Sequence, residues 1–538
     1  MRKLRRMLFT AAIGVAMAAV TVFPALAIDK DIVILHTNDV HCGIEGSIGY
    51  AGVAAYKEQM KEETPYVTLV DAGDAIQGAP VGTLSEGGYI IRIMNEVGYD
   101  IAVPGNHEFD YGLDRLLDLS TQLDCGYISC NLMNERKGSA VFEPYKMVIY
   151  DDVKVAFIGV TTPESFTKST PTYFQDIFGR YVFGFKEDAD GTALYKCVQA
   201  AADSARDAGA DFVILVGHLG IEGSTDYWSS ESIIANTSGI HAAIDGHSHE
   251  EFTKSVPNED GVLIPLAQTG TKLSAIGKLT ITPEGEIKTE MVEEVSEKDA
   301  RVQGVIDDIK AQYEESLKVV LGHADVALTS LNTETGERAV RNAETNLGDF
   351  CADAFRYMMG ADIGIMNGGG IRASLSAGDI TYGDALTVFP FGNMLCVAEV
   401  TGQQVKDALE MGARLYPEEN GGFIQISGLT YTIDSSIPSS VVTDEKRNFV
   451  GVDGEYRVQD IYVGGEPLDL AKTYTVASHN YWLKSGGDGM SMFVGSHILK
   501  DETMVDVDSI TSYISEYLNG SVGEEYQNPQ GQGRITIK

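Results

Sequence analysis

Apolar residues follow two periodicities along the first half of the chain. Short runs rich in Val, Ile and Leu alternate with longer segments in which apolar residues recur every three or four positions. The short runs predict strands and the longer segments predict helices, for example a helix over 192–208. The predicted strands are 32–35, 67–70, 101–103, 153–160, 212–216 and 242–244. Strands that alternate with helices are typical of an α/β fold.

The strand pattern fades near residue 295, and a charged helical stretch follows at 296–318. It contains few Gly and no Pro, which favours a continuous helix between two domains. A second alternating block lies beyond it. The elements expected there include helices at 346–359 and 403–415 and strands at 363–366 and 473–476. The predicted domains are therefore 28–295 and 321–538, joined by a linker helix at 296–320.

The first 27 residues have the pattern of a signal peptide. Four basic residues precede an apolar run over 7–22, and Ala25-Leu26-Ala27 supplies a small-x-small cleavage site. A membrane anchor is the alternative, but the run is short for a span and the cleavage pattern follows it directly. No later stretch of the sequence is long and apolar enough to span a bilayer. We expect a secreted or extracytoplasmic protein with no stable membrane insertion.

Composition and charge narrow the class of partner. Hydrophobic residues make up 44% of the chain, an ordinary share for a globular protein. The net charge of −38 repels nucleic acid polymers and anionic lipid. A phosphorylated small molecule must then be attracted by local positive charge, from metal ions and a few arginines. Among six cysteines, Cys125 and Cys130 are the only near pair, and a disulfide between them is not favoured.

Polar residues follow the predicted strands of the first block at five places. Asp, Asn and His suit divalent ions, and in open α/β sheets ligands bind beyond the carboxyl ends of strands. A lone His after a strand is usually structural, and an Asp-Gly pair is usually a turn. Seven such residues at five strand ends point instead to a metal centre. The candidate ligands are Asp39, His41, Asp74, Asn106, His218, His247 and His249.

A glycine-rich motif in the second block points to a ligand that the backbone approaches closely. Asn367-Gly368-Gly369-Gly370-Ile371-Arg372 follows an apolar run, and its three consecutive glycines remove every Cβ. A tight turn is the commoner role of such a run, but here Asn367 and Arg372 flank it, and both can reach polar oxygens. Arginine suits multi-point contact with phosphate or ribose, and Arg341 stands upstream of the motif.

The motifs D-x-H, G-D-x-x-x-G, G-N-H-E, G-H and G-H-x-H, in that order, resemble those of the calcineurin-like metallophosphoesterases. The second block resembles the C-terminal domain of 5'-nucleotidases, and the resemblance extends from about residue 31 to residue 537. It implies an α/β fold, in which an N-terminal α/β/β/α metallophosphoesterase sandwich is joined by a helix to a C-terminal α/β domain. It also implies that the second domain moves between open and closed states.

By motif match, the resemblance implies two metal sites that share a carboxylate. One ion is expected on Asp39, His41, Asp74 and His249, and the other on Asp74, Asn106, His218 and His247. Two divalent ions such as Zn²⁺ or Mn²⁺, about 3.5–4 Å apart, activate a hydroxide and clamp the phosphoryl oxygens during in-line displacement. His107 is expected to act on the phosphate beside Asn106, with Asp110 orienting its ring. A purely structural loop residue is the alternative for His107.

The resemblance also implies a nucleoside pocket in the second domain. Phe391 lies in a Pro-Phe-Gly segment typical of the family, and Trp482 stands six residues before Asp488, where the family has Phe. Two such rings would stack on the base, although aromatic residues are usually core, and Tyr481 is the alternative to Trp482. Asp488 is expected to accept hydrogen bonds from ribose hydroxyls. The implied substrate-binding residues are Arg341, Asn367, Gly369, Arg372, Phe391, Asn393, Trp482 and Asp488.

Two positions depart from the family pattern. Cys42 follows the D-x-H motif where the family usually has Gly, and the Arg often found in the early Gly-rich stretch is absent from 49–55. Because soft sulfur is not needed beside a carboxylate-rich site, we expect Cys42 to be inert. Some contact on the phosphate side is then expected to be made differently.

The expected activity is that of a secreted 5'-nucleotidase, which releases phosphate from small extracellular nucleotides such as AMP. Hydrolysis of 2',3'-cyclic nucleotides or 3'-nucleotides is the nearest alternative, and the Gly-Gly-Asp-Gly form at 486–489 counts against it. Nucleotide-sugar hydrolysis is a further alternative. A nucleotide-binding surface protein with weak catalysis belongs to another class, and the intact ligand set argues against it.

Overall fold

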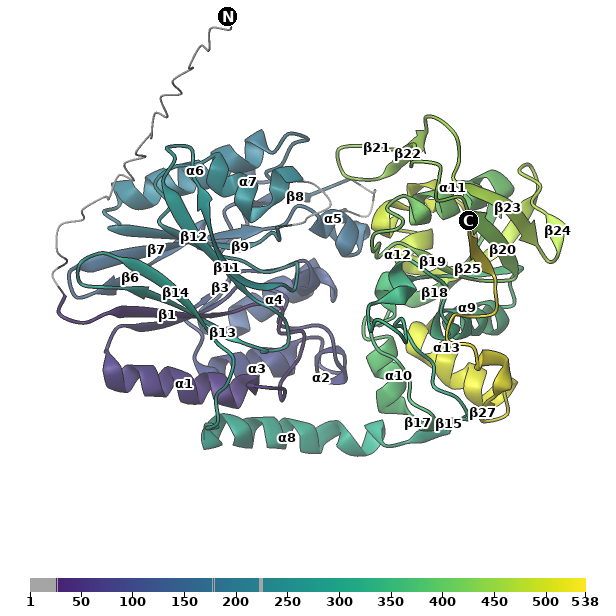
Figure 1. Cartoon of the computed structure of the whole chain (residues 1–538), viewed down its shortest axis with the longest axis horizontal. Helices are drawn as coiled ribbons and strands as arrows, with labels where there is room; N and C mark the ends of the chain where they lie inside the picture. The colour runs from purple at the N-terminus through teal and green to yellow at the C-terminus, as the bar shows by residue number, and fades with distance from the viewer. Residues whose placement is uncertain (1–25, 27, 177, 179, 222–225) are drawn as a thin grey trace, which may run out of the picture.

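The computed structural model describes residues 26, 28–176, 178, 180–221 and 226–538 (Figure 1). Two lobes lie side by side, and helix α8 (Ala300–Leu317) runs along one edge from the first lobe to the second. The predicted signal peptide, 1–27, lies outside the described residues except for residue 26.

Two large β-sheets pack face to face in the first lobe, beside a smaller three-stranded sheet. One has the order β14 (Ile287–Val292), β13 (Ile276–Ile281), β1 (Ile32–Thr37), β2 (Val67–Asp71) and β3 (Ile101–Ala102). The other has the order β11 (Glu251–Pro257), β12 (Leu263–Thr269), β10 (Ala242–Ile244), β9 (Phe212–His218), β7 (Val153–Thr161) and β6 (Tyr145–Tyr150). Strands β1, β2 and β3 are parallel, and so are β7, β9, β10 and β12.

Alternation along the strands explains the layers, because successive side chains point to opposite faces of a sheet. Ile34 of β1 is buried with Ile214 of β9 in one apolar cluster between the sheets, whereas Leu35 belongs to the cluster beneath the helices. The covering helices are α1 (Gly49–Glu63), α3 (Gly88–Val97) and α4 (Leu113–Gln122) on the first sheet, and α6 (Thr192–Asp207) and α7 (Ser230–Ala235) on the second. The expected α/β/β/α sandwich is confirmed.

The second lobe is built on one mixed five-stranded sheet. Its order is β19 (Ile424–Ser427), β16 (Ile363–Asn367), β25 (Thr473–His479), β18 (Met394–Thr401) and β26 (His497–Val505). Helices α9 (Asn346–Met359) and α13 (Asp506–Ser512) cover one face, and α11 (Gly402–Ala413) covers the other. A hairpin of β21 (Val441–Thr443) and β22 (Phe449–Val452) projects toward the first lobe (Figure 1).

Helix α8 is anchored on the first lobe. The Asp299 side chain caps it by accepting hydrogen bonds from the backbone N–H groups of Arg301 and Val302. Val302, Ile306 and Ile309 recur at helical spacing and are fully buried in the first-lobe core. Within the described residues, no helix combines the length and apolar character needed to cross a membrane. All six cysteines, Cys125 and Cys130 included, are free thiols in this structure.

Candidate functional site

The seven candidate ligands converge where parallel strands of the two first-lobe sheets end. Asp39 and His41 follow β1, Asp74 follows β2 and Asn106 follows β3; His218 ends β9, and His247 and His249 follow β10. Six of the seven fall into two groups, Asp39–His41–His249 and Asp74–His218–His247, and the donor atoms of each group lie within 4.8 Å of one another. A third group, His41–Asp74–His107, joins these two. The candidate ligands, which follow separate strands in the sequence, therefore lie close together in the structure.

The backbone at this cluster is strained. Left-handed φ values, which side chains other than Gly adopt rarely, occur at five of the seven candidate ligands. They are Asp39 (49°), His41 (44°), Asp74 (59°), His247 (85°) and His249 (59°). Such strain persists only where the surroundings enforce it, and it is concentrated at functional sites. The cluster is also tightly packed, because a Cβ on Gly105 would overlap the Asp74 carboxylate.

Backbone carbonyls fix the orientation of two imidazole rings. His41 Nδ1 lies 3.0 Å from the Gln77 carbonyl oxygen, and His218 Nδ1 lies 2.7 Å from that of Ala72. In the neutral rings each Nδ1–H is therefore the donor, and each Nε2 presents a lone pair to the cluster. Both Nε2 atoms have close polar neighbours, because His41 Nε2 lies 3.0 Å from His249 Nε2 and His218 Nε2 lies 3.1 Å from Asp74 Oδ2.

Two buried atoms of the cluster have no hydrogen-bond partner among the described residues. They are Asp39 Oδ1 and His218 Nε2. Burial opposes a charged imidazole, but the Asp74 carboxylate outweighs it and raises the pKa of His218 to about 10. The two buried carboxylates thus draw positive charge into the cluster. Imidazole nitrogens and carboxylate oxygens gathered at one place in the buried cluster fit the donor set of a divalent cation.

His107 stands beside this cluster on a different set of contacts. Its Nδ1 lies 2.6 Å from Asp110 Oδ2, and its backbone N–H donates to Asp74 Oδ1 at 2.8 Å. Burial disfavours the imidazolium, yet the carboxylates of Asp110 and Asp74 outweigh burial and raise the pKa of His107. The contact with Asp110 thus holds the ring by one of its two nitrogens.

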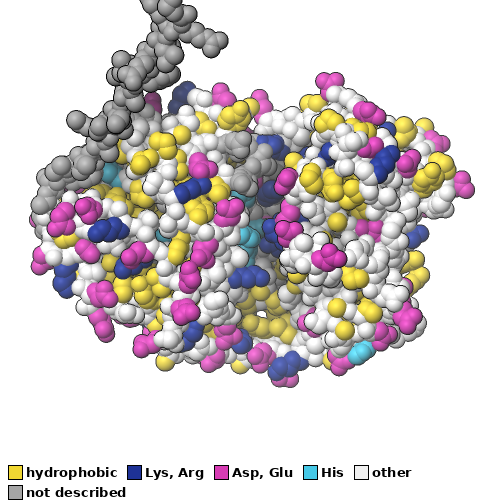
Figure 2. Space-filling view, viewed as in Figure 1, with side chains coloured by type: hydrophobic (Ala, Val, Ile, Leu, Met, Phe, Trp, Pro, Cys, Tyr) yellow, Lys and Arg dark blue, Asp and Glu magenta, His cyan; other side chains and the backbone are white. Residues whose placement is uncertain are grey.

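A cavity of about 340 Å³ between the lobes brings the two halves of the predicted site together. Figure 2 shows His and Lys or Arg side chains gathered in this hollow. The His107 and Phe391 rings, from different lobes, have centroids 5.8 Å apart. The Thr83 hydroxyl also donates to the Pro390 carbonyl at 2.6 Å, so the lobes are in contact beside the cavity.

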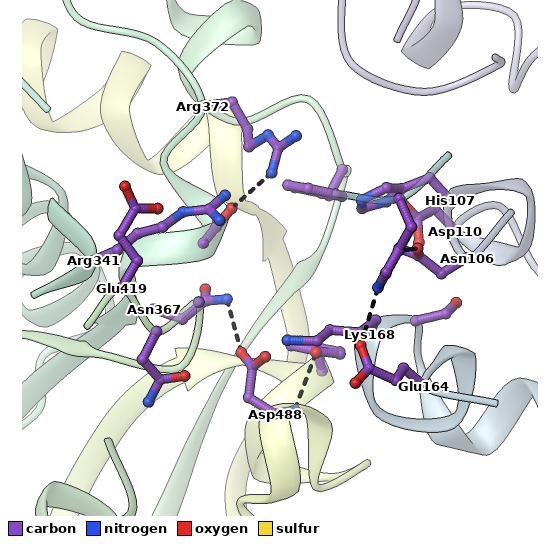
Figure 3. Close-up of a pocket in the computed structure, with 18 of the residues that line it drawn as sticks. Asn106, His107, Asp110, Glu164, Lys168, Arg341, Asn367, Arg372, Glu419 and Asp488 are labelled. Carbon is purple, nitrogen blue, oxygen red and sulfur yellow. Dashed lines mark hydrogen bonds and ion pairs between the residues drawn. The ribbon is translucent and has the colours of Figure 1, made fainter. Parts of the chain in front are cut away.

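The second-lobe wall of the cavity holds most of the predicted substrate-binding residues (Figure 3). Those that line it are Arg341, Asn367, Gly369, Arg372, Phe391, Asn393 and Asp488. Asn367 donates to Asp488 Oδ2 at 3.1 Å. Gly369 N–H donates to the Gly421 carbonyl at 2.8 Å, and a Cβ on Gly369 would lie 3.0 Å from that backbone, which explains the glycine. Burial lowers the pKa of Arg341 to about 9, so this cation gains from an anionic partner.

The structure differs from the prediction at Trp482. This ring is fully buried and does not line the cavity, whereas the adjacent Tyr481 does. Both residues lie in the short helix α12 (Asn480–Leu483), where neighbouring side chains point about 100° apart, so only one can face the cavity. Trp482 Nε1 instead donates to Asp488 Oδ2 at 3.2 Å, and the Asp488 backbone N–H donates to the Tyr481 hydroxyl at 3.0 Å.

Further residues line the cavity that sequence reasoning did not single out. Glu164 lies three residues beyond the end of β7, so the strand-end rule itself would have found it. Arg338 stands three residues before Arg341 and pairs with Glu419 at 2.8 Å. The additional lining residues include Glu164, Lys168, Arg338, Arg414, Glu419 and Asn420. Most of them come from loops that carry no motif.

Each half of the chain matches one family model. The model described as calcineurin-like phosphoesterase matches residues 32–251. The model described as 5'-nucleotidase, C-terminal domain, matches residues 320–495.

Individual proteins resemble the chain over nearly its whole length. The trifunctional nucleotide phosphoesterase protein YfkN of Bacillus subtilis (strain 168) is 29% identical over 94% of this chain, which spans 35% of that longer protein. Protein UshA of Escherichia coli (strain K12) is 27% identical over 94% of this chain and 96% of its own length. The crystal structure of a 5'-nucleotidase precursor from Thermus thermophilus has 26% identity and a TM-score of 0.75, covering 94% of this chain and 99% of that one. Together with the matched models, these likenesses mean that the chain belongs to the 5'-nucleotidase family and is a metal-dependent phosphoester hydrolase.

Proposed function

We propose that this protein is an extracytoplasmic 5'-nucleotidase that holds two divalent ions and releases phosphate from nucleotides such as AMP. The observation that carries the proposal is the shared cavity, in which four of the seven candidate metal ligands face the glycine-rich motif and Phe391. These four are Asp74, Asn106, His247 and His249. A nucleotide has a phosphate at one end and a base at the other. It would therefore use both walls of this cavity at once.

The proposed ion sites share one carboxylate. The first consists of Asp39, His41, Asp74 and His249, and the second of Asp74, Asn106, His218 and His247. Support comes from the potential ligand atoms that gather there, including His247 Nδ1 and Asn106 Oδ1, which lie 2.8 Å apart. Zn²⁺ and Mn²⁺ both accept such imidazole and carboxylate donors. When bound, two such ions supply a nucleophile at neutral pH and stabilise charge on the phosphoryl oxygens.

Cationic side chains around the cluster would act on the phosphate directly. His107 faces the cavity, and in its protonated form it would donate a hydrogen bond to a phosphoryl oxygen as negative charge develops. Asp110 keeps the ring in place for this donation. Arg341 and Arg372 line the opposite wall, where burial lowers the pKa of both guanidinium groups. An anionic ligand would therefore stabilise their charged forms. They would bind the phosphate through several N–H donors each.

The nucleoside would lie against the second lobe. Phe391 and Tyr481 both line the cavity and offer aromatic faces on which a base could stack. Asp488 is held by Asn367 and Trp482, so its carboxylate is oriented to accept hydrogen bonds from ribose hydroxyls. We therefore assign the second stacking ring of the proposed pocket to Tyr481 rather than to Trp482. We propose that Trp482 positions the Asp488 carboxylate.

Phosphate release across a substrate panel tests the proposal. AMP, ADP, ATP, UDP-glucose and 2',3'-cyclic AMP would be compared, each with added Mn²⁺, Zn²⁺ or Mg²⁺ and with a chelator. We expect AMP to be hydrolysed and the chelator to abolish the reaction. Faster release from 2',3'-cyclic AMP or UDP-glucose than from AMP would contradict the 5'-nucleotidase assignment. Adenosine binding without turnover of any substrate would indicate a binding protein instead.

Export is tested separately by the N-terminus of the mature protein. Expression with residues 1–27 in a bacterial host, followed by N-terminal sequencing of the extracytoplasmic fraction, should give a chain that begins at Ile28. A full-length chain retained in the cytoplasm would contradict the proposed location.

A further inference from the structure

Glu164 occupies a strand end of the first lobe that the proposed function does not use. It follows β7, the parallel neighbour of β9, and it immediately precedes the short helix α5 (Ser165–Lys168). Its side chain is only 4% exposed, and its Oε2 lies 3.0 Å from His247 Nε2. A buried carboxylate therefore stands directly behind one of the proposed metal ligands (Figure 3).

The contact with Glu164 fixes the hydrogen-bonding role of the His247 ring. An ionised carboxylate only accepts, so opposite an ionised Glu164 the ring donates Nε2–H. In the neutral ring Nδ1 then keeps its lone pair, and this atom lies 2.8 Å from Asn106 Oδ1. The ring is thus set in the tautomer and orientation that a cation beside Asn106 requires.

His247 differs in this respect from two other rings among the candidate metal ligands. His41 and His218 each donate to a neutral backbone carbonyl, of Gln77 and of Ala72. A hydrogen bond to a charged carboxylate is stronger than one to a neutral carbonyl, and it makes the opposite ring nitrogen a more basic ligand. Of the three rings, His247 would gain most in donor strength.

We propose that Glu164 is a positioning residue that orients and strengthens His247 as a metal ligand, and so sets the affinity of the ion shared by His247, His218 and Asn106. The inference rests on the proposed function, because it requires an ion at that place. It goes beyond that function by giving Glu164 a task separate from substrate contact, although its side chain also lines the cavity.

Metal binding in the absence of substrate tests this role. The metal-stripped protein would be titrated with Mn²⁺, and bound metal would be counted by elemental analysis after equilibrium dialysis. Wild type should bind two ions. Glu164→Gln, which keeps a hydrogen-bond acceptor but loses the charge, should weaken one ion about 10-fold, and Glu164→Ala should weaken it on the order of 100-fold. The other ion should bind as in wild type.

Three further variants separate positioning from general damage to the fold. Glu290→Gln removes an exposed charge on β14 and should leave both affinities unchanged. His247→Ala should weaken the same ion, and adding Glu164→Ala to it should have little further effect, because Glu164 acts through His247. With Co²⁺ as the probe, Glu164→Gln should alter the visible absorption of one of two bound ions.

The possible failures are distinguishable. If wild type and Glu164→Ala bind two ions with equal affinity, the role of Glu164 is overturned while the proposed metal centre stands. If the effects of Glu164→Ala and His247→Ala simply add, Glu164 does not act through His247, and the inference is likewise wrong. If wild type binds no divalent ion, the proposed function fails and the inference fails with it. Glu164→Gln keeps the shape of the side chain, so it remains informative if Glu164→Ala does not fold.

Discussion

The two walls of the cavity are built in different ways. The first-lobe wall is made of strand ends, with strained left-handed backbone at Asp39 and Asp74 and side chains that are almost fully buried. The second-lobe wall is made of loops and short helices, and its aromatic face, Phe391 and Tyr481, comes from segments far apart in the chain. Rigid strands suit the placement of reacting groups, which tolerate errors of only about 0.5 Å. Loops suit recognition, where a stacked base tolerates small shifts.

This contrast predicts that a substitution on the first wall lowers the rate of phosphate release, whereas a substitution on the second wall weakens nucleotide binding. The largest effect is expected at Asp74, the proposed bridge between both ions. Asp74→Asn should lower phosphate release by on the order of 10³-fold or more, because it removes a buried charge that both ions require. Elemental analysis should show metal loss, and circular dichroism should show a folded protein. Near-normal turnover with two bound ions would refute the bridge.

His107 sharpens the contrast within the first wall, because it is proposed to act on the phosphate without binding metal. His107→Ala should lower kcat on the order of 10²-fold while both ions remain bound. Asp110→Asn, which keeps the shape of the residue that orients the ring, should have a smaller effect on kcat. Loss of metal from His107→Ala would mean that the residue is a ligand.

Tyr481 tests the second wall. Tyr481→Ala should cost about 1–3 kcal/mol of nucleotide binding, or roughly 5- to 150-fold in KM for AMP, through lost stacking. Tyr481→Phe keeps the ring and should retain most of the affinity. Trp482→Phe keeps an aromatic ring in the core and should change KM less than Tyr481→Ala. The reverse order of effects for Tyr481 and Trp482 would restore the original prediction from the sequence.

The smallest effect is expected where the lobes touch outside the cavity. Lys446, in the turn between β21 and β22, pairs with Glu187 of the first lobe at 3.0 Å, and its ammonium lies 3.9 Å from the centre of the Phe166 ring. Lys446→Ala should weaken the contact between the lobes by about 0.5–1 kcal/mol and raise KM for AMP roughly 2- to 5-fold. Lys254→Ala, which breaks a pair with Glu231 inside the first lobe, is the matched control and should leave KM unchanged.

The same contrast explains how much of the site could be predicted from the sequence. On the first wall, strand and ligand are adjacent in the chain, so the order of motifs was enough to bring Asp39, Asp74 and His218 together. The prediction from the sequence missed Glu164 because no recognised motif contains it, although it also lies beyond the end of a parallel strand.

On the second wall, the sequence located the segments but not the facing side chains. Counting from Asp488 identified α12, yet the choice between Tyr481 and Trp482 depends on how that helix is rotated against the core. Arg338 and Glu419 lie 81 residues apart and meet only through tertiary packing. The layered fold itself followed from alternation along the strands, whereas the distance between the lobes depends on contacts such as those of α8 and Lys446, which no local pattern encodes.

The most direct test of the division of labour is the effect of Phe391→Ala on two substrates. AMP carries a base, whereas p-nitrophenyl phosphate carries only a small aryl group, so kcat/KM would be measured for both with wild type and variant. We expect kcat/KM for AMP to fall by roughly 5- to 150-fold, with a nearly unchanged value for the aryl ester and unchanged metal content. Equal losses on both substrates would contradict the account. They would mean that Phe391 maintains the structure of the site and does not bind the base.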